Sequence, residues 1–218
     1  PPGKIELKGK GNREQLQVES LRIAWLDGEA AGSGRLGWGN GLDWRANLSG
    51  TGFDPAALLP DWSGDIGFAV RGSGTLPPEG ALTADITLKS LSGTLRGEPL
   101  AGKVEAQLTG SRLTLRQMRL QVGTASLTGS GSVGETWNMD WRLKVAQLGS
   151  IHPALGGSIR AEGRLDGARR SPRIRLDASA EGLEIQDIQS KAASLNADID
   201  LAGGLPWDAP GRRNGRFG

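Results

Sequence analysis

The chain has 218 residues, including 35 glycines, 7 tryptophans and no cysteine, and its formal net charge is +2. Without cysteine it can have no disulfide, no thiolate nucleophile and no cysteine-ligated zinc or iron–sulfur site. Its 26 basic and 24 acidic residues nearly balance, which argues against nucleic acid as a partner. The high glycine content favours β structure with many turns.

Segments in which apolar and polar residues alternate begin near Ile5 and continue through most of the chain. The segment 16–25 alternates but slips by one residue at Glu19-Ser20, which predicts a β-bulge. The pair Asp27-Gly28 then predicts a hairpin turn. The one helical turn that the sequence favours lies within 53–60, where prolines bound the run.

Period-two alternation predicts strands because it sends alternate side chains to opposite faces. About a dozen such segments with almost no helix predict an all-β protein. After residue 205 the composition changes, and we expect residues 206–218 to form a disordered tail. Beyond the first hairpin, alternation predicts strands in the ranges 42–48, 66–70, 82–88, 104–108, 113–115, 118–122, 137–145, 159–161, 174–180 and 195–201.

An internal repeat links the two halves of the chain. A shift of 97 residues superposes Gly32-Ser33-Gly34 on Gly129-Ser130-Gly131 and Asp43-Trp44-Arg45 on Asp140-Trp141-Arg142. The same shift carries the slip at Glu19-Ser20 onto the sequence after Leu115. Repetition of this kind is typical of a stacked architecture, and it divides residues 1–205 into related units of approximately 1–101 and 102–201.

The sequence offers no convincing catalytic or cofactor site. The run Gly32 to Gly37 fits a dinucleotide-binding pattern, but β-type sequence follows it where a helix is required, so glycines at strand ends and bends are the better interpretation. The single histidine, His152, precedes a proline and is interpreted as a turn residue. We therefore predict no enzyme activity, no metal and no cofactor.

Several motifs resemble the TamB family, the inner-membrane component of the translocation and assembly module of Gram-negative bacteria and a relative of AsmA-like proteins. The motifs are the run 91–100, the sequence Leu113-Thr114-Leu115, the segment 123–131, and the joint from Asp43 to Gly64. The resemblance covers most of residues 16–201. It implies an elongated, repetitive antiparallel sheet that is curled into an open, taco-like groove with an apolar concave face.

The resemblance also implies a function. In that family the groove spans the periplasm, moves phospholipid toward the outer membrane and supports assembly and secretion of autotransporter-type proteins. The implied partners are phospholipid acyl chains, an outer-membrane barrel of the Omp85 type and autotransporter client strands. The implied location is the periplasmic face of the inner membrane, and we expect this chain to be an internal piece whose anchor and barrel-docking parts lie outside it.

The apolar residues of the repeated strands are candidates for lining the lipid groove. For the tryptophans, a buried core is as good an interpretation as a channel for apolar ligands. Two alternatives to lipid transport also stay open: a chaperone or scaffold that pairs with client strands, and a structural β-solenoid. The candidate groove residues are Trp44, Leu113, Leu115, Leu120, Trp137, Met139, Trp141, Leu143 and Val145.

Overall fold

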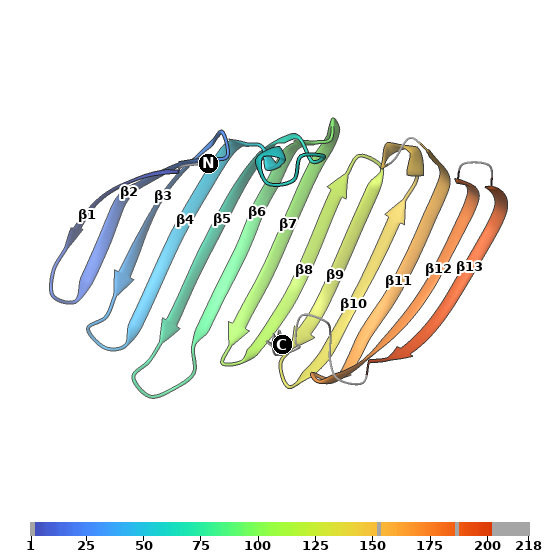
Figure 1. The fold of residues 1–218 in the computed structure, drawn as a ribbon. Helices are drawn as coiled ribbons and strands as arrows, with labels where there is room; N and C mark the ends of the chain where they lie inside the picture. The colour runs from blue at the N-terminus through green and yellow to red at the C-terminus, as the bar shows by residue number, and fades with distance from the viewer. Residues whose placement is uncertain (1–2, 152–153, 186–187, 202–218) are drawn as a thin grey trace, which may run out of the picture.

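The computed structural model describes residues 3–151, 154–185 and 188–201. It forms one sheet of thirteen strands in which each strand is hydrogen-bonded to the next in the sequence (Figure 1). All of the pairings are antiparallel, so the chain runs up and down across the sheet as a meander. The predicted all-β, repetitive antiparallel architecture is confirmed.

The strands are between eight and fifteen residues long. Two short 3₁₀ helices, η1 (Pro55–Ala57) and η2 (Leu148–Ser150), interrupt the connections after the fourth and tenth strands. The strands are β1 (Lys4–Gly11), β2 (Gln15–Trp25), β3 (Gly28–Gly37), β4 (Leu42–Phe53), β5 (Gly64–Leu76), β6 (Thr83–Leu95), β7 (Glu98–Thr109), β8 (Arg112–Val122), β9 (Ala125–Val133), β10 (Thr136–Val145), β11 (Leu155–Ala168), β12 (Ser171–Ile185) and β13 (Ile188–Asp200).

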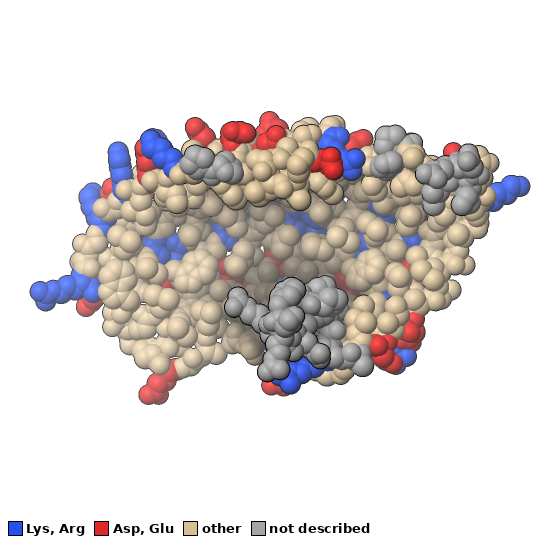
Figure 2. Space-filling view, in the orientation of Figure 1, with Lys and Arg blue, Asp and Glu red and all other residues tan. Residues whose placement is uncertain are grey.

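The sheet is curled but not closed. Figure 2 shows a face hollowed along its length, on which uncharged residues dominate; charged residues are most prominent at the rims, and a few are visible within the hollow. The accessible surface is 15000 Å², whereas a compact monomer of this size exposes roughly 9,600 Å². The large excess is expected for a single curled layer with one open side.

Alternation along the strands separates apolar from polar side chains across the whole sheet. Directly paired residues of neighbouring strands lie on the same face. Trp44, for example, is paired with Leu36 on β3 and with Gly74 on β5, whereas its neighbour Arg45 is paired with Arg35 and Ser73. The register therefore builds one apolar face and one polar face that extend over all thirteen strands.

Both predicted phase slips are β-bulges. The β2–β3 register shifts between Val18 and Leu21, and the β8–β9 register shifts between Leu115 and Met118. Each bulge restores the apolar residues to the same face after the slip, so neither strand exposes apolar side chains on the polar face. The predicted hairpin is present too, with Leu26 (φ 51°) and Asp27 (φ 60°) both in the left-handed region, as a type I′ turn requires.

Two strands were not predicted from the sequence, and both are rich in small residues. β3 and β9 contain the Gly-Ser-Gly runs that alternation does not single out, because glycine and alanine carry little apolar signal. The interpretation of these glycines as residues at strand ends and bends is wrong for Gly32 and Gly34, which lie in the middle of β3. No helix follows this run, since the chain turns directly into β4, so it lacks the context of a dinucleotide site.

The predicted helical turn corresponds to η1, while η2 was not anticipated. These two helices mark a repeated order of elements: β2 to β5 with η1 between the last two strands, and β8 to β11 with η2 in the same place. A division near residues 101 and 102 falls inside β7, so the units of the sequence repeat share one continuous sheet. His152 and the predicted tail 206–218 lie outside the described residues.

Candidate functional site

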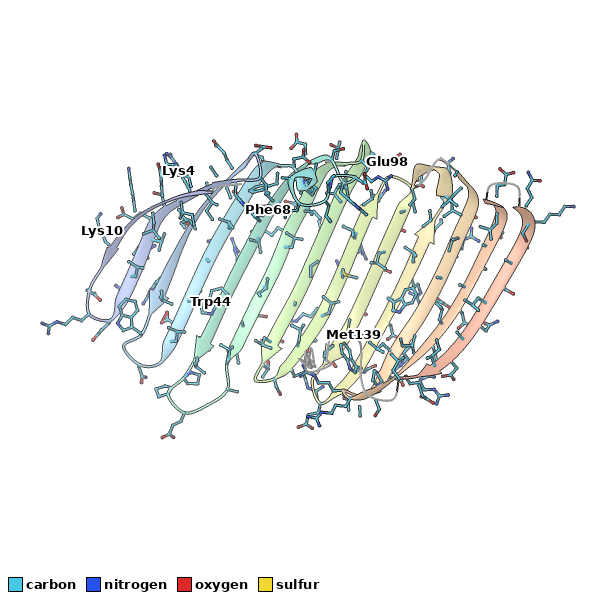
Figure 3. All side chains as sticks on the ribbon, in the orientation of Figure 1. Lys4, Lys10, Trp44, Phe68, Glu98 and Met139 are labelled. Carbon is cyan, nitrogen blue, oxygen red and sulfur yellow. The ribbon has the colours of Figure 1, made fainter. Side chains whose placement is uncertain are left out.

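The candidate site is the apolar face of the sheet, which is the hollowed face in Figure 2. In Figure 3, Trp44 and Met139 lie on the face turned to the viewer, whereas Lys4 lies at the rim. Alternation places the predicted lining residues of each strand on this same face, and pairing connects the strands. The residues of β8 and β10 lie close together, joined through β9: Leu113, Leu115, Leu120, Trp137, Met139, Trp141, Leu143 and Val145. Trp44 of β4 lies on the same face but several strands away.

The β10 residues show how the rows form. Leu143 is paired with Leu127 on β9 and with Ala161 on β11, and Met139 is paired with Gly131 and Leu165. Trp137 is paired with Val133, and its indole nitrogen donates a hydrogen bond to the carbonyl oxygen of Arg169 at 3.3 Å. The rows continue from strand to strand, so the candidate site is a trough across the sheet and not a pocket within one hairpin.

Residues of β3 and β9 belong to the same face but were not among the predicted lining residues. Leu36 is paired with Leu16 and Trp44, and Leu127 is paired with Leu120 and Leu143. β3 and β9 contain few large apolar residues. Leu36 and Leu127 can be assigned to the apolar face only from their pairing with the strands on either side. Sequence alone gave no such register.

Most of this face is only partly covered. Few apolar side chains of the described residues are buried: Leu26, Ala30, Ala84, Leu100, Val145, Leu148 and Pro172. By contrast, Leu113 is 44 % exposed, Leu195 is 55 % exposed and Ile199 is 46 % exposed. Apolar surface left in water on this scale marks an interaction site in a soluble protein.

The opposite face is charged and laced with ion pairs. On β10 and β11, Arg142 lies 3.1 Å from Glu162, and Arg164 lies 3.7 Å from Asp140. Arg173 hydrogen-bonds Asp198 at 2.6 Å, and this hydrogen bond lowers the pKa of the Asp198 carboxyl. At the other end of the sheet, a hydrogen bond from Lys4 lowers the pKa of Glu6. All of these groups are well solvated, so the polar face has the character of an ordinary wet surface.

Two local hollows lie on the polar face. One has a volume of about 740 Å³ and is bordered by Lys4, Arg22 and Glu29. Another, of about 820 Å³, is bordered by Arg116, Arg142 and Arg175. Both are open to solvent, and charged side chains border each of them, although the first also has small neighbours such as Ala24 and Ala31. The trough on the apolar face differs from them because it is formed by the curvature of the whole sheet.

A folded loop carries apolar side chains to one rim of the trough. The Asp54 carboxylate accepts hydrogen bonds from the backbone nitrogens of Ala56 and Gly64, both at 2.9 Å, and thereby closes the loop around η1. Trp62 in this loop lies under the guanidinium of Arg96 at 5.8 Å from the ring centroid. The Arg96 backbone also donates a hydrogen bond to the Ser63 carbonyl at 2.7 Å, so the loop is fixed to the β6–β7 hairpin.

Chemistry other than apolar contact finds little support in the described residues. No group of three or more histidine, aspartate or glutamate side chains there is arranged to hold a metal ion. Within the same residues, no helix has both the length and the apolar character needed to cross a bilayer. The arrangement can offer an extended apolar surface to a partner with apolar chains or side chains.

Comparison with known proteins supplies the family. The model of the TamB N-terminal domain matches residues 1–206. The translocation and assembly module subunit TamB of Haemophilus influenzae is 23 % identical over 203 residues, which are 93 % of this chain and 16 % of that relative. The chain thus spans about a sixth of the length of this curated relative. No solved structure matches the chain. Because the family model covers nearly the whole sequence, the chain belongs to the TamB family.

Proposed function

We propose that this chain is a segment of a periplasmic bridge that guides the acyl chains of phospholipids along its apolar trough, between the inner and outer membranes. In this role the curled sheet shields the lipid tails from water, while the headgroups stay at the open side. The proposal extends to support of outer-membrane and autotransporter protein assembly. It includes no catalytic step and no cofactor.

One observation carries the proposal: the apolar face continues across all thirteen strands without a covering layer among the described residues. A globular β protein packs such a face against a second layer. Here large side chains such as Leu113 and Leu195 stay exposed. Acyl chains are long, flexible and uniformly apolar, so they fit an extended trough better than a closed pocket.

The length of the trough supports a conduit. Neighbouring strands lie about 4.8 Å apart, so a dozen strands extend on the order of 60 Å. This is longer than a single acyl chain and longer than the hydrocarbon core of a bilayer, which is about 30 Å thick. A structure that only stored one lipid would not need an apolar face of this length.

The location and the partners follow from family membership and are part of the proposal. The H. influenzae relative is named as a subunit of a translocation and assembly module. We infer a place in the periplasm for this chain, with anchorage at the inner membrane and an Omp85-type barrel in the outer membrane as the protein partner. The described residues offer no side chain to which barrel docking can be assigned.

Photo-crosslinking in living cells tests the lipid path. A photoreactive amino acid at Met139, Trp141 or Leu143, in the protein as its gene encodes it, is expected to capture phospholipid, identified by mass spectrometry after purification. The neighbouring polar-face positions Asn138 and Lys144 are the matched controls and should capture little. If the apolar-face positions capture only neighbouring strands, the face is a closed core and the proposal is wrong.

A second function is favoured by one edge of the sheet. The outer edge of β13 has no strand partner among the described residues, and its thirteen-residue length offers a long row of free backbone groups. The β1 edge differs because it carries Lys4, Lys8 and Lys10 and a bulge at Gly9, all features that discourage pairing. Pairing of a client β-strand with β13 would make the chain a chaperone or scaffold.

The two functions separate in one experiment. Replacement of Ala193 by proline on β13 removes a backbone donor and weakens pairing along this strand. Under the scaffold function this variant loses secreted autotransporter while lipid capture at Met139 continues. Under the lipid-path function, Leu143→Asp abolishes capture at Met139, and secretion falls only as a consequence of the altered outer membrane.

A further inference from the structure

Large side chains on the apolar face lie down over glycines of the neighbouring strand. A Cβ atom built at Gly28 would lie 2.7 Å from the Phe53 ring, and one at Gly32 would lie 2.9 Å from a methyl carbon of Leu48. The same arrangement recurs at Gly50, beneath the rings of Phe53 and Phe68. The glycines thus leave room for side chains that would otherwise stand away from the sheet.

Trp44 shows the arrangement most fully. A Cβ atom at Gly74 would lie 2.6 Å from its Nε1, and a Cβ atom at Gly72 would lie 2.7 Å from its Cζ3. Gly72 and Gly74 alternate on the same face of β5. Because both ends of the indole approach the backbone at two successive positions, the ring lies along β5 and does not project into the trough.

Trp141 repeats this geometry in the second half of the sheet. A Cβ atom at its pairing partner Gly163 would lie 2.6 Å from Cζ2, 2.7 Å from Cε2 and 2.8 Å from Nε1. These three atoms are contiguous along one side of the indole, so this side of the ring lies directly against Gly163. Trp44 and Trp141 are separated by 97 residues, the period of the sequence repeat.

Glycine within a strand lowers the stability of that strand, so a glycine beneath each tryptophan needs a compensating benefit. Covering a glycine with an aromatic ring recovers some of that stability. A branched residue with an upright aromatic neighbour would stabilise the strand as well, but it would fill the trough. The flat arrangement keeps both the apolar area of the indole and the depth of the trough.

We propose that Trp44 over Gly72 and Gly74, and Trp141 over Gly163, set the floor height of the trough and so determine whether an acyl chain can pass. This inference rests on the proposed lipid path and assigns to these residues the control of its depth. The tryptophans offer flat apolar platforms to the chain. The glycines are positioning residues, since they act only through the orientation of the indoles.

The test uses lipid capture by a photoreactive amino acid at Met139, in the protein as its gene encodes it. Gly163→Ala forces the Trp141 indole away from the backbone and into the trough, so we expect capture to fall several-fold. The double variant Gly163→Ala with Trp141→Leu lacks the indole, and capture should return to near the starting level. Gly67→Ala is the matched control, because Gly67 lies on the polar face and its Cβ atom would come no closer than 3.3 Å to any neighbour.

Each outcome decides between the possibilities. Reduced capture with rescue by the double variant supports the inference, because a loss of strand stability would not be rescued by removing the aromatic cover. Unchanged capture in Gly163→Ala overturns the inference and leaves the lipid path standing. Reduced capture without rescue overturns it too, because the effect is then a structural one. Absence of capture in the unmodified protein defeats both the lipid path and the inference.

Discussion

The two faces of this sheet are built from the same strands, and the side chains of adjacent residues lie in different environments, one apolar and one polar. On β10, Leu143 continues an apolar row with Leu127 and Ala161, while Arg142 next to it pairs with Glu162 on the other face. The polar face needs nothing more, because water and cross-strand ion pairs satisfy its groups. On the apolar face, no second layer among the described residues covers the exposed apolar side chains. We therefore expect the function on that side.

The comparison also shows two uses of small residues. On the polar face, Ala31, Ser49 and Ser92 border an open hollow. On the apolar face, Gly74 and Gly163 lie beneath tryptophans. Small residues therefore leave open space on one side of the sheet and make room for flat aromatic rings on the other.

The largest expected effect comes from placing a charge on the apolar face. Leu143→Asp should lower phospholipid capture at Met139 by more than tenfold, because a carboxylate in the trough is costly to bring against acyl chains. The sheet should still fold, as judged by far-ultraviolet circular dichroism, since the trough is open to water. Lys144→Asp, one residue away on the polar face, is the control and should leave capture unchanged. Unfolding by Leu143→Asp would instead reveal a closed core.

A second variant should damage the sheet itself. Gly131 has φ 142°, and a Cβ atom there would clash with the Asn138 carbonyl oxygen, so Gly131→Ala is expected to destabilise the protein by about 1–3 kcal/mol. Urea unfolding measures the change. A Cβ atom at Gly67 on the polar face would lie 3.3 Å from the Gly50 carbonyl oxygen, a far milder contact, so Gly67→Ala should shift stability by less than about 1 kcal/mol. Equal effects of the two substitutions would contradict the special role of Gly131.

A smaller effect is expected at the rim loop. Asp54→Ala removes the acceptor for the Ala56 and Gly64 backbone nitrogens and should cost about 1 kcal/mol. Limited proteolysis should then cut between residues 55 and 63 sooner than in the unmodified protein. Asp61→Ala, an exposed position of the same loop, serves as the comparison. Equal protease sensitivity of the two variants would show that Asp54 does not hold the loop.

The smallest effect is expected on the polar face. The hydrogen bond from Arg173 lowers the pKa of Asp198, so the pair contributes stability above the carboxyl pKa of the unfolded chain. That contribution is lost as pH falls through the lowered pKa of the folded state. Asp198→Asn should therefore lower the melting temperature slightly at pH 7, and the difference from the unmodified protein should shrink as the pH is lowered. A large loss of stability at pH 7 would mean that this face is not simply solvated.

Three features of the fold could be predicted from the sequence because they depend on local patterns. The alternation in 137–145 requires a one-sided strand, and the slips at Glu19-Ser20 and after Leu115 require bulges if each strand is to keep its apolar side chains on one face. The hairpin at Asp27-Gly28 follows from turn chemistry. Strands β3 and β9 could not be found in this way, because their small residues carry little periodic signal.

The sequence by itself determined that the chain is made of repeated one-sided strands, since side-chain alternation is a property of each strand alone. It did not determine which residues meet across strands, because pairing register depends on bulges and turns acting together. Only the tertiary structure decided that the thirteen strands form a single curled layer, that its apolar side stays open, and that Trp44 and Trp141 lie flat over glycines from the next strand. The tryptophans and the glycines they cover are about 20 to 30 positions apart in the sequence. Local alternation and turn motifs do not predict contacts over that separation.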